Sequence, residues 1–207
     1  MNIDDRDVIG HLATIAGAGA DHLTALQNRL AAAAQRDGVL DIAYRVVDSP
    51  VGPLLIAATE VGLLRVAYAS EGHDSVLQRL ADKVSPRIVL APDRLDTAAR
   101  ELDEYFAGVR HAFDMPLDWR LSAGFRGTVL RHLPEIGYGR TASYAAVAEL
   151  AGNPRAVRAV GTACATNPLP VVVPCHRVVR SDGAMGGYLG GPQAKRLLLD
   201  LEAATPG

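Results

Sequence analysis

The nine residues from Val171 to Val179 place one cysteine inside a strongly β-forming stretch. They read Val-Val-Val-Pro-Cys-His-Arg-Val-Val. β-branched residues favour extended, buried backbone, so we expect a short buried strand that runs into a turn with Cys175 at its edge. A thiol held in this way is a candidate nucleophile, but a free buried cysteine more often packs as a small hydrophobic residue. The adjacent His176 does not decide between these alternatives, because sequence neighbours need not face each other.

The composition is ordinary for a globular protein, but the charge differs between the two halves. The chain has 207 residues, of which 49% are hydrophobic and 21% charged, enough for one large domain or two small ones. Residues 120–207 hold ten Lys and Arg against five Asp and Glu, whereas residues 1–119 hold eleven against eighteen. The C-terminal half is therefore the candidate nucleic-acid surface, although a solvated helix face would give the same count.

Two cysteines, Cys164 and Cys175, and an acidic N-terminus indicate a reducing compartment. Asp4, Asp5 and Asp7 stand where a secretory signal would be basic, and no apolar run is long enough to cross a bilayer. We therefore expect a cytoplasmic protein in which Cys175 stays a free thiol.

The hydrophobic spacing predicts three segments. Residues 1–38 carry leucines at helical spacing and predict a helical extension whose apolar face packs on the next domain. Residues 39–118 predict an antiparallel meander followed by two helices and an extended piece. The expected strands are 42–47, 54–58 and 63–68, the helices lie near 76–84 and 95–106, and the extended piece is 113–117.

Residues 119–207 predict a mostly helical domain with a helix-turn-helix. One helix is expected at 125–133, and Ser143 can cap a second at 144–150. Gly152-Asn153 then turns the chain, and Pro154 is expected at the first position of the next helix. On that helix, the side expected to face the core holds Val157, Val160 and Cys164, and a separate flat side holds Ala156, Ala159 and Ala163.

Further motifs lie at fixed spacing around Cys175. They are Tyr144, Arg158, Asn167-Pro168, Pro174 to Val178, Gly187-Tyr188, Gly190-Gly191, Lys195 and the run Leu197 to Glu202. In these motifs the chain resembles the O6-alkylguanine-DNA alkyltransferase family, also called methylated-DNA-protein-cysteine methyltransferases. The resemblance covers residues 120–203 almost without gaps and residues 40–118 more weakly, whereas residues 1–38 have no counterpart.

The resemblance implies a fold and a function. The fold is an α/β ribonuclease-H-like domain with a small antiparallel sheet, followed by a winged helix-turn-helix domain. The function is direct reversal of DNA alkylation: a methyltransferase flips O6-alkylguanine, and O4-alkylthymine, out of the duplex and transfers the alkyl group to its own Cys175. Nothing in the sequence suggests a means of cleaving the resulting thioether, so each molecule acts once.

The resemblance also gives individual residues their roles. His176, oriented by Glu202, deprotonates Cys175 through a water, and Asn167 braces the active-site turn. Tyr188 closes the substrate pocket. The remaining pocket residues are Pro170, Val178, Leu189 and Lys195.

For DNA, the resemblance implies binding through the minor groove as a monomer. Arg158 fills the place that the flipped base leaves, and Tyr144 rotates the phosphate. The alanine side of the second helix, Ala156, Ala159 and Ala163, lies against the groove, where little sequence is read. No cofactor and no metal are expected, because the zinc site of some relatives needs cysteines and this chain has none before Cys164.

Two departures from the family and three alternatives remain open. Leu130 stands where relatives often have an aromatic residue, and Leu189 where they usually have a small one. A non-catalytic DNA-binding relative would lack Cys175. A winged-helix transcription factor would carry long polar side chains on its recognition helix. A thiol hydrolase would need an oxyanion site, and none can be located.

Overall fold

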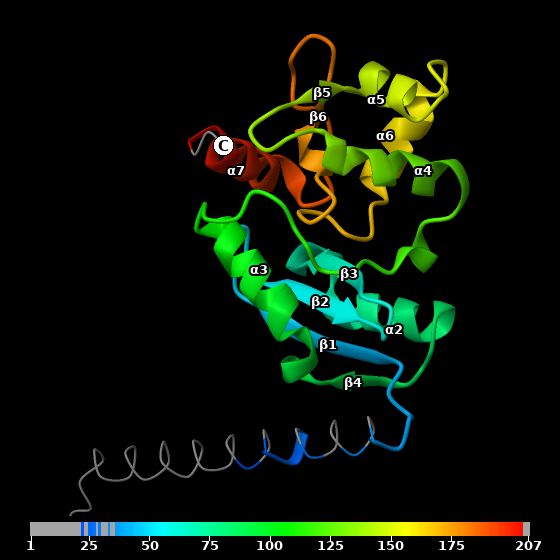
Figure 1. Ribbon diagram of the computed structural model, residues 1–207, viewed down its shortest axis with the longest axis vertical. Coiled ribbons are helices and arrows are strands. Elements are labelled where there is room, and N and C mark those ends of the chain that lie inside the picture. Colours follow the sequence, from blue (N-terminus) through cyan, green and yellow to red (C-terminus); the bar gives the residue numbers. More distant parts are fainter. Residues whose placement is uncertain (1–21, 23–24, 28, 30–32, 34–35, 205–207) are drawn as a thin grey trace, which may run out of the picture.

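The computed structural model describes residues 22, 25–27, 29, 33 and 36–204, which form a sheet part and a helical part stacked on it (Figure 1). Most of the predicted N-terminal extension lies outside the described residues. Those of its residues that are described before Asp37 are helical. Leu26, a described member of its predicted apolar face, is 45% exposed, which does not fit a face buried on the neighbouring domain.

The sheet part is built on the three strands that the apolar runs predict. β1 (Ile42–Val47), β2 (Leu54–Ala58) and β3 (Leu63–Tyr68) are antiparallel neighbours. A fourth strand, β4 (Ile88–Leu90), pairs in parallel with β1, so that the order is β3-β2-β1-β4. The predicted antiparallel meander is therefore confirmed, but β4, which was not predicted, makes the whole sheet mixed. β4 was hard to predict for two reasons. A parallel neighbour is joined by a long crossover, here one that includes a helix, so β1 and β4 are far apart in the sequence. The three residues of β4 are also too few to show the two-residue period of a strand.

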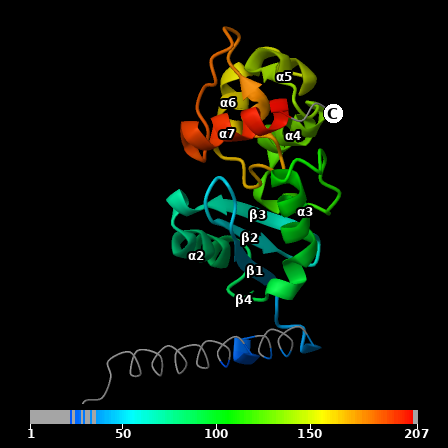
Figure 2. The same cartoon turned by 90° about the vertical axis from the view of Figure 1, so that its left-hand side faces the viewer.

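Alternate strand residues point to opposite faces of the sheet, and a different helix covers each face. Ile42, Leu55 and Leu64 pack with Val76 and Leu80 of α2 (His73–Lys83). On the other face the strands pack with α3 (Asp96–Phe106) and with the helical part. The two helices lie on opposite sides of the sheet (Figure 2). Both were predicted from their apolar spacing. The helical part is thus held on the α3 side.

The helical part contains four α-helices and a small parallel pair of strands among its described residues. The helices are α4 (Gly124–His132), α5 (Tyr144–Leu150), α6 (Val157–Ala165) and α7 (Gly191–Ala204), and the strands are β5 (Ala142–Ser143) and β6 (Val178–Val179). Among the residues that the structure describes, the short 3-10 helices are η1 (Ala69–Glu71), η2 (Pro92–Leu95), η3 (Trp119–Leu121), η4 (Leu133–Glu135) and η5 (Cys175–Arg177).

The helix-turn-helix forms as predicted except at the start of α6. The Ser143 hydroxyl accepts a hydrogen bond from the Ala146 amide at 3.1 Å and caps α5. Gly152, with φ +75°, ends the helix in the left-handed region, which glycine adopts at little cost. Pro154 is not the first residue of α6. It lies in a turn closed by the Ala156 amide on the Asn153 carbonyl, so the helix begins later.

Two residues of α6 face the opposite way from the prediction. The buried face holds Val160, Ala163 and Cys164, at spacing i, i+3 and i+4. Val157 is 38% exposed, so its assignment to the core was wrong, and Ala163 is fully buried, so it cannot belong to an exposed alanine side. Because α6 begins at Val157, that side chain lies in the first turn, beyond the packed face.

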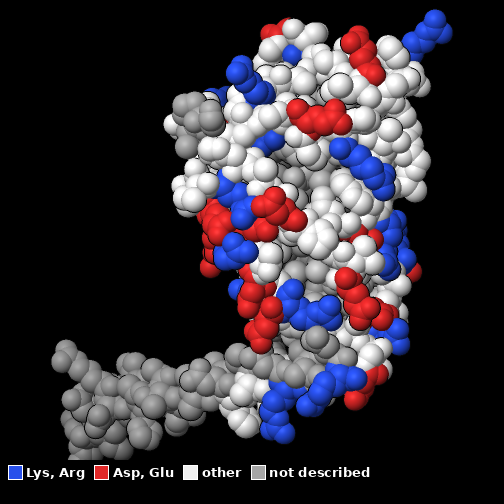
Figure 3. Space-filling view, in the orientation of Figure 1, with Lys and Arg blue, Asp and Glu red and all other residues white. Residues whose placement is uncertain are grey.

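One face of the molecule mixes both signs of charge. On the face drawn in Figure 3, Lys and Arg side chains are interspersed with Asp and Glu, so this face shows no broad basic surface. Within the described part of the chain, no helix combines the length and apolar character that crossing a membrane requires.

Candidate active site

The segment before Cys175 is a buried turn and not the predicted strand. The Asn167 side chain makes the hydrogen bonds that a neighbouring strand would otherwise make to this backbone. Its Oδ1 accepts from the Leu169 amide at 3.0 Å, and its Nδ2 donates to the Val173 carbonyl at 2.8 Å. Val171 adopts a φ of +72°, which is costly for a β-branched residue and is imposed by this closed turn. The β-branched run is buried as expected, but its backbone turns because Asn167 pairs with it internally.

Asn167 also holds the thiol of Cys175. Cys175 begins η5 and is 2% exposed, and its Sγ accepts a hydrogen bond from Asn167 Nδ2 at 3.1 Å. Burial raises the pKa of this thiol to about 11, while the Asn167 amide and the charge of Lys195 oppose the rise. The resting form is therefore the thiol, and a base must remove its proton before it can act as a nucleophile.

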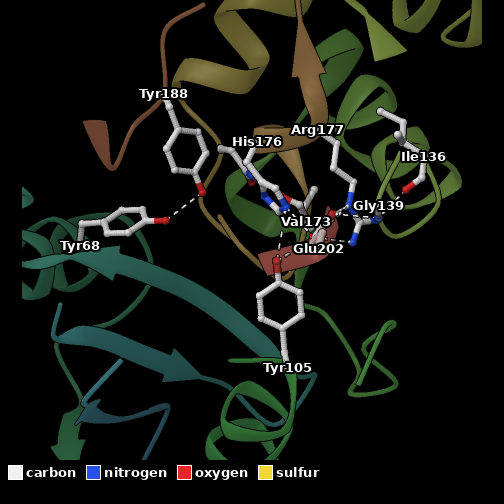
Figure 4. A network of polar contacts seen from close by, with 10 residues as sticks. Tyr68, Tyr105, Ile136, Gly139, Val173, His176, Arg177, Tyr188 and Glu202 are labelled. Carbon is white, nitrogen blue, oxygen red and sulfur yellow. Dashed lines mark hydrogen bonds and ion pairs between the residues drawn. The ribbon is translucent and has the colours of Figure 1, made fainter. Parts of the chain in front are cut away.

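The imidazole of His176 is fixed by Glu202, far away in the sequence (Figure 4). His176 Nε2 lies 2.8 Å from Glu202 Oε1, and both side chains are buried. Burial lowers the pKa of His176, so the ring is neutral, and the carboxylate selects the tautomer with the proton on Nε2. Nδ1 is then an acceptor, and it has no hydrogen-bond partner among the described side chains and backbone.

Glu202 is the centre of a buried network that sequence reasoning only partly found. Arg177 donates through Nε to Oε2 at 2.9 Å and through Nη2 to Oε1 at 3.0 Å, and the Tyr105 hydroxyl donates to Oε1 at 2.7 Å. The Gly139 amide completes the set at 3.2 Å. Despite burial, the hydrogen bonds from His176 and Arg177 lower the pKa of Glu202 to about 2, so it stays ionised. Tyr105 and Arg177 were missed as site residues.

The remaining predicted pocket residues differ in how far they are buried. Pro170 and Val178 are buried, while Tyr188 and Leu189 are partly exposed. Lys195 is fully buried, and its Nζ donates to the Val178 carbonyl at 2.7 Å and to the Met185 carbonyl. Lys195 thus ties the strand after Cys175 to the following loop.

The two residues predicted to handle DNA lie at the helix-turn-helix. Tyr144 is the first residue of α5 and is half-buried, close enough to Gly186 that a β-carbon there would lie 2.9 Å from its hydroxyl. Arg158 is exposed on α6, whereas Ala156 and Ala159 are half-buried. Cys164 is buried on the inner side of α6, where burial raises the pKa of its thiol to about 12 and disfavours the thiolate.

Tyr68 is a third residue that sequence reasoning missed. It ends β3 in the sheet part, yet its hydroxyl lies 2.8 Å from the hydroxyl of Tyr188 (Figure 4). The sequence signal was weak, because a tyrosine that ends an apolar run reads as a core residue. Only the packing of the two parts brings it to the pocket.

Comparisons with known proteins agree with this arrangement. The model of the 6-O-methylguanine DNA methyltransferase ribonuclease-like domain matches residues 42–119, and that of the DNA binding domain of the same family matches residues 124–204. A methylated-DNA-protein-cysteine methyltransferase of Methanosarcina barkeri is 37% identical over 77% of this chain and 96% of its own length. One of Mycobacterium bovis is 41% identical over 78% of this chain and 92% of its own.

Solved structures give the same relationship. A crystal structure of Mycobacterium tuberculosis O6-methylguanine methyltransferase has a TM-score of 0.70 at 36% identity and covers 80% of this chain and 95% of that one. The M. tuberculosis protein in complex with DNA has a TM-score of 0.68 at 36% identity and covers 79% and 94%. With both family models and most of each relative matched, the chain belongs to the O6-methylguanine DNA methyltransferase family, the methylated-DNA-protein-cysteine methyltransferases that bind and repair DNA.

Proposed function

We propose that Cys175 is the residue that accepts the alkyl group from O6-alkylguanine, and from O4-alkylthymine, in duplex DNA. The thiolate sulfur attacks the alkyl carbon, so that a carbon–sulfur bond forms while the carbon–oxygen bond to the base breaks. The base leaves with the electron pair and takes up a proton, which restores guanine or thymine. The product on the protein is a thioether, so each molecule reacts once.

His176 supplies the base that the buried thiol needs. Nδ1 of its neutral ring takes the Cys175 proton through a water, and the Glu202 carboxylate stabilises the imidazolium that forms. Arg177 balances the charge of Glu202 in the resting state. The observation that carries the proposal is the Nε2 to Oε1 contact of 2.8 Å, because it leaves the buried Nδ1 as an unpaired acceptor on the residue next to Cys175 in the chain.

The helix-turn-helix supplies the access to the base. We propose that α6 enters the minor groove through two half-buried alanines, Ala156 at its N-cap and Ala159 in its first turn, with Arg158 replacing the flipped base in the stack. Tyr144, at the start of α5, rotates the phosphate. The protein acts as a monomer in this scheme, since one chain carries both the helix-turn-helix and the thiol.

A titration of repair against protein tests the proposal. Protein is mixed with excess duplex that carries one O6-methylguanine, and the repaired strand is counted at long times. We expect repair to stop at one base for each active protein molecule, with a rate that rises with protein concentration. Continued turnover would contradict a stable thioether and favour a hydrolytic reaction.

Arg158→Ala should separate base extrusion from alkyl transfer. We expect the single-turnover rate on duplex DNA to fall by about ten-fold or more, because unstacking a base costs a few kcal/mol. The rate with free O6-benzylguanine should not change, since the free base needs no extrusion. Arg155→Ala is the matched control, because Arg155 is also exposed but lies in the turn before α6. Equal losses on both substrates would place Arg158 in the chemistry or the fold.

A further inference from the structure

The edge strand β3 contacts the transfer site at two places. β3 is an edge strand, and its Val66 amide donates to the Pro168 carbonyl at 2.9 Å. Arg65, on the same strand, donates through Nη1 to the Asn167 carbonyl at 3.3 Å. Tyr68 ends the strand and reaches Tyr188. One strand of the sheet part therefore contacts the turn that holds the thiol and the residue that closes the pocket.

Tyr68 is itself rigidly placed. It is 3% exposed, and its amide donates to Glu71 Oε1 at 3.1 Å, while Glu71 forms an ion pair with Arg65. Gly190 packs against its ring so closely that a β-carbon there would lie 2.5 Å from the ring carbon Cζ. The ring can therefore move little, and the position of its hydroxyl is fixed by the sheet.

Tyr188, by contrast, belongs to a largely exposed loop, which Lys195 contacts through the Met185 carbonyl. Residues 181–184, 186 and 187 of this loop are exposed, and Gly183, Gly186 and Gly191 have positive φ. The Tyr188 ring meets Tyr68 edge-on at 5.9 Å between centroids and meets His176 edge-on at 6.3 Å. Tyr188 thus lies between the sheet and the catalytic histidine, and its hydroxyl is hydrogen-bonded to the hydroxyl of Tyr68 (Figure 4).

From this geometry we infer that Tyr68 is a positioning residue, which locks Tyr188 into the pocket wall and so limits the size of the alkyl group that Cys175 accepts. The inference rests on the proposed function. A methyl group is small enough to reach the thiol with the wall in place. A benzyl group fits only when the Tyr188 side chain moves aside, and Tyr188 can move only when the hydrogen bond between its hydroxyl and that of Tyr68 breaks. The sheet part therefore sets substrate range although it contributes no reacting atom.

Tyr68→Phe tests this inference, because it removes the hydroxyl and keeps the ring that packs on Gly190. The same duplex is prepared with O6-methylguanine or O6-benzylguanine, and single-turnover rate constants are measured for each. We expect the ratio of the benzyl to the methyl rate constant to rise about five-fold, the scale of one buried hydrogen bond. Tyr188→Phe should give the same rise, and the double variant no more than either single one, since all three lack one shared bond.

Tyr44→Phe is the matched control, since Tyr44 packs with the α2 side of the sheet and does not approach the pocket. Its ratio should equal that of the wild type. A purely structural role for Tyr68 would lower the thermal midpoint or both rate constants together and would leave the ratio unchanged, which would overturn the inference. Additive effects in the double variant would also overturn it. A wild type that transfers neither group to Cys175 would overturn the proposed function together with this inference.

Discussion

Cys175→Ala abolishes alkyl transfer in our account and leaves binding to alkylated duplex DNA largely intact. The sulfur is the atom to which the new bond forms. Asn167 holds it in the turn that also carries His176, whereas the thiol of Cys164 lies on the packed face of α6. Binding should persist because affinity comes from the phosphate backbone and the flipped base. Transfer is measured as loss of O6-methylguanine from the duplex, and binding as retardation of the same duplex.

Cys164→Ser is the matched control for this variant. Its transfer rate should stay close to that of the wild type, with a modest loss of stability from a hydroxyl buried in the place of a thiol. If Cys175→Ala lost binding together with transfer, the cysteine would be structural. If Cys164→Ser lost transfer, the wrong thiol would have been assigned.

Glu202→Gln should reduce both stability and transfer. The change leaves Arg177 buried without its counterion, and breaking such a pair costs about 3–5 kcal/mol in the free energy of unfolding. It also removes the charge that stabilises the imidazolium of His176, so the single-turnover rate of the folded protein should fall by about 10²-fold or more. Urea unfolding and single-turnover kinetics measure the two effects separately.

The pH dependence of stability gives an independent check on Glu202. Its folded pKa, about 2, lies below the ordinary value of 4.5, so its contribution is fully present above pH 4.5 and is lost as the pH falls towards 2. The Glu202→Gln variant should not show this loss of stability between pH 4.5 and 2. Tyr105→Phe removes one donor and keeps the charge, so it should cost far less stability. A Gln variant as stable and as fast as the wild type would remove Glu202 from the mechanism.

The sheet part shows which elements of a fold can be predicted from local pattern. β1, β2 and β3 were predicted at their observed residues because turn compositions separate them. β4 was missed because a three-residue strand has no measurable period and its partner lies far back in the chain. The valine run from Val171 to Val173 was wrongly predicted as a strand for a different reason. Its residues favour a strand, but the side chain of Asn167 closes the backbone into a turn.

The site could be predicted only where one segment carries its residues or where the family resemblance supplied them. Cys175, His176 and Asn167 lie within one short stretch, and the structure brings Glu202 to His176. Tyr105 and Tyr68 come from the sheet part, where a tyrosine in an apolar pattern reads as core packing. Their hydroxyls gain a role only from the docking of the two parts, which no local pattern encodes.

Mapping the alkylated residue shows whether Cys175 is the acceptor of the alkyl group. The full chain is incubated with duplex DNA that carries O6-methylguanine, digested, and analysed by mass spectrometry. We expect a mass gain of one methyl group in place of one hydrogen, located on Cys175, with the peptide of Cys164 unchanged. A methyl group on any other residue, or restored guanine with an unmodified Cys175, would contradict it.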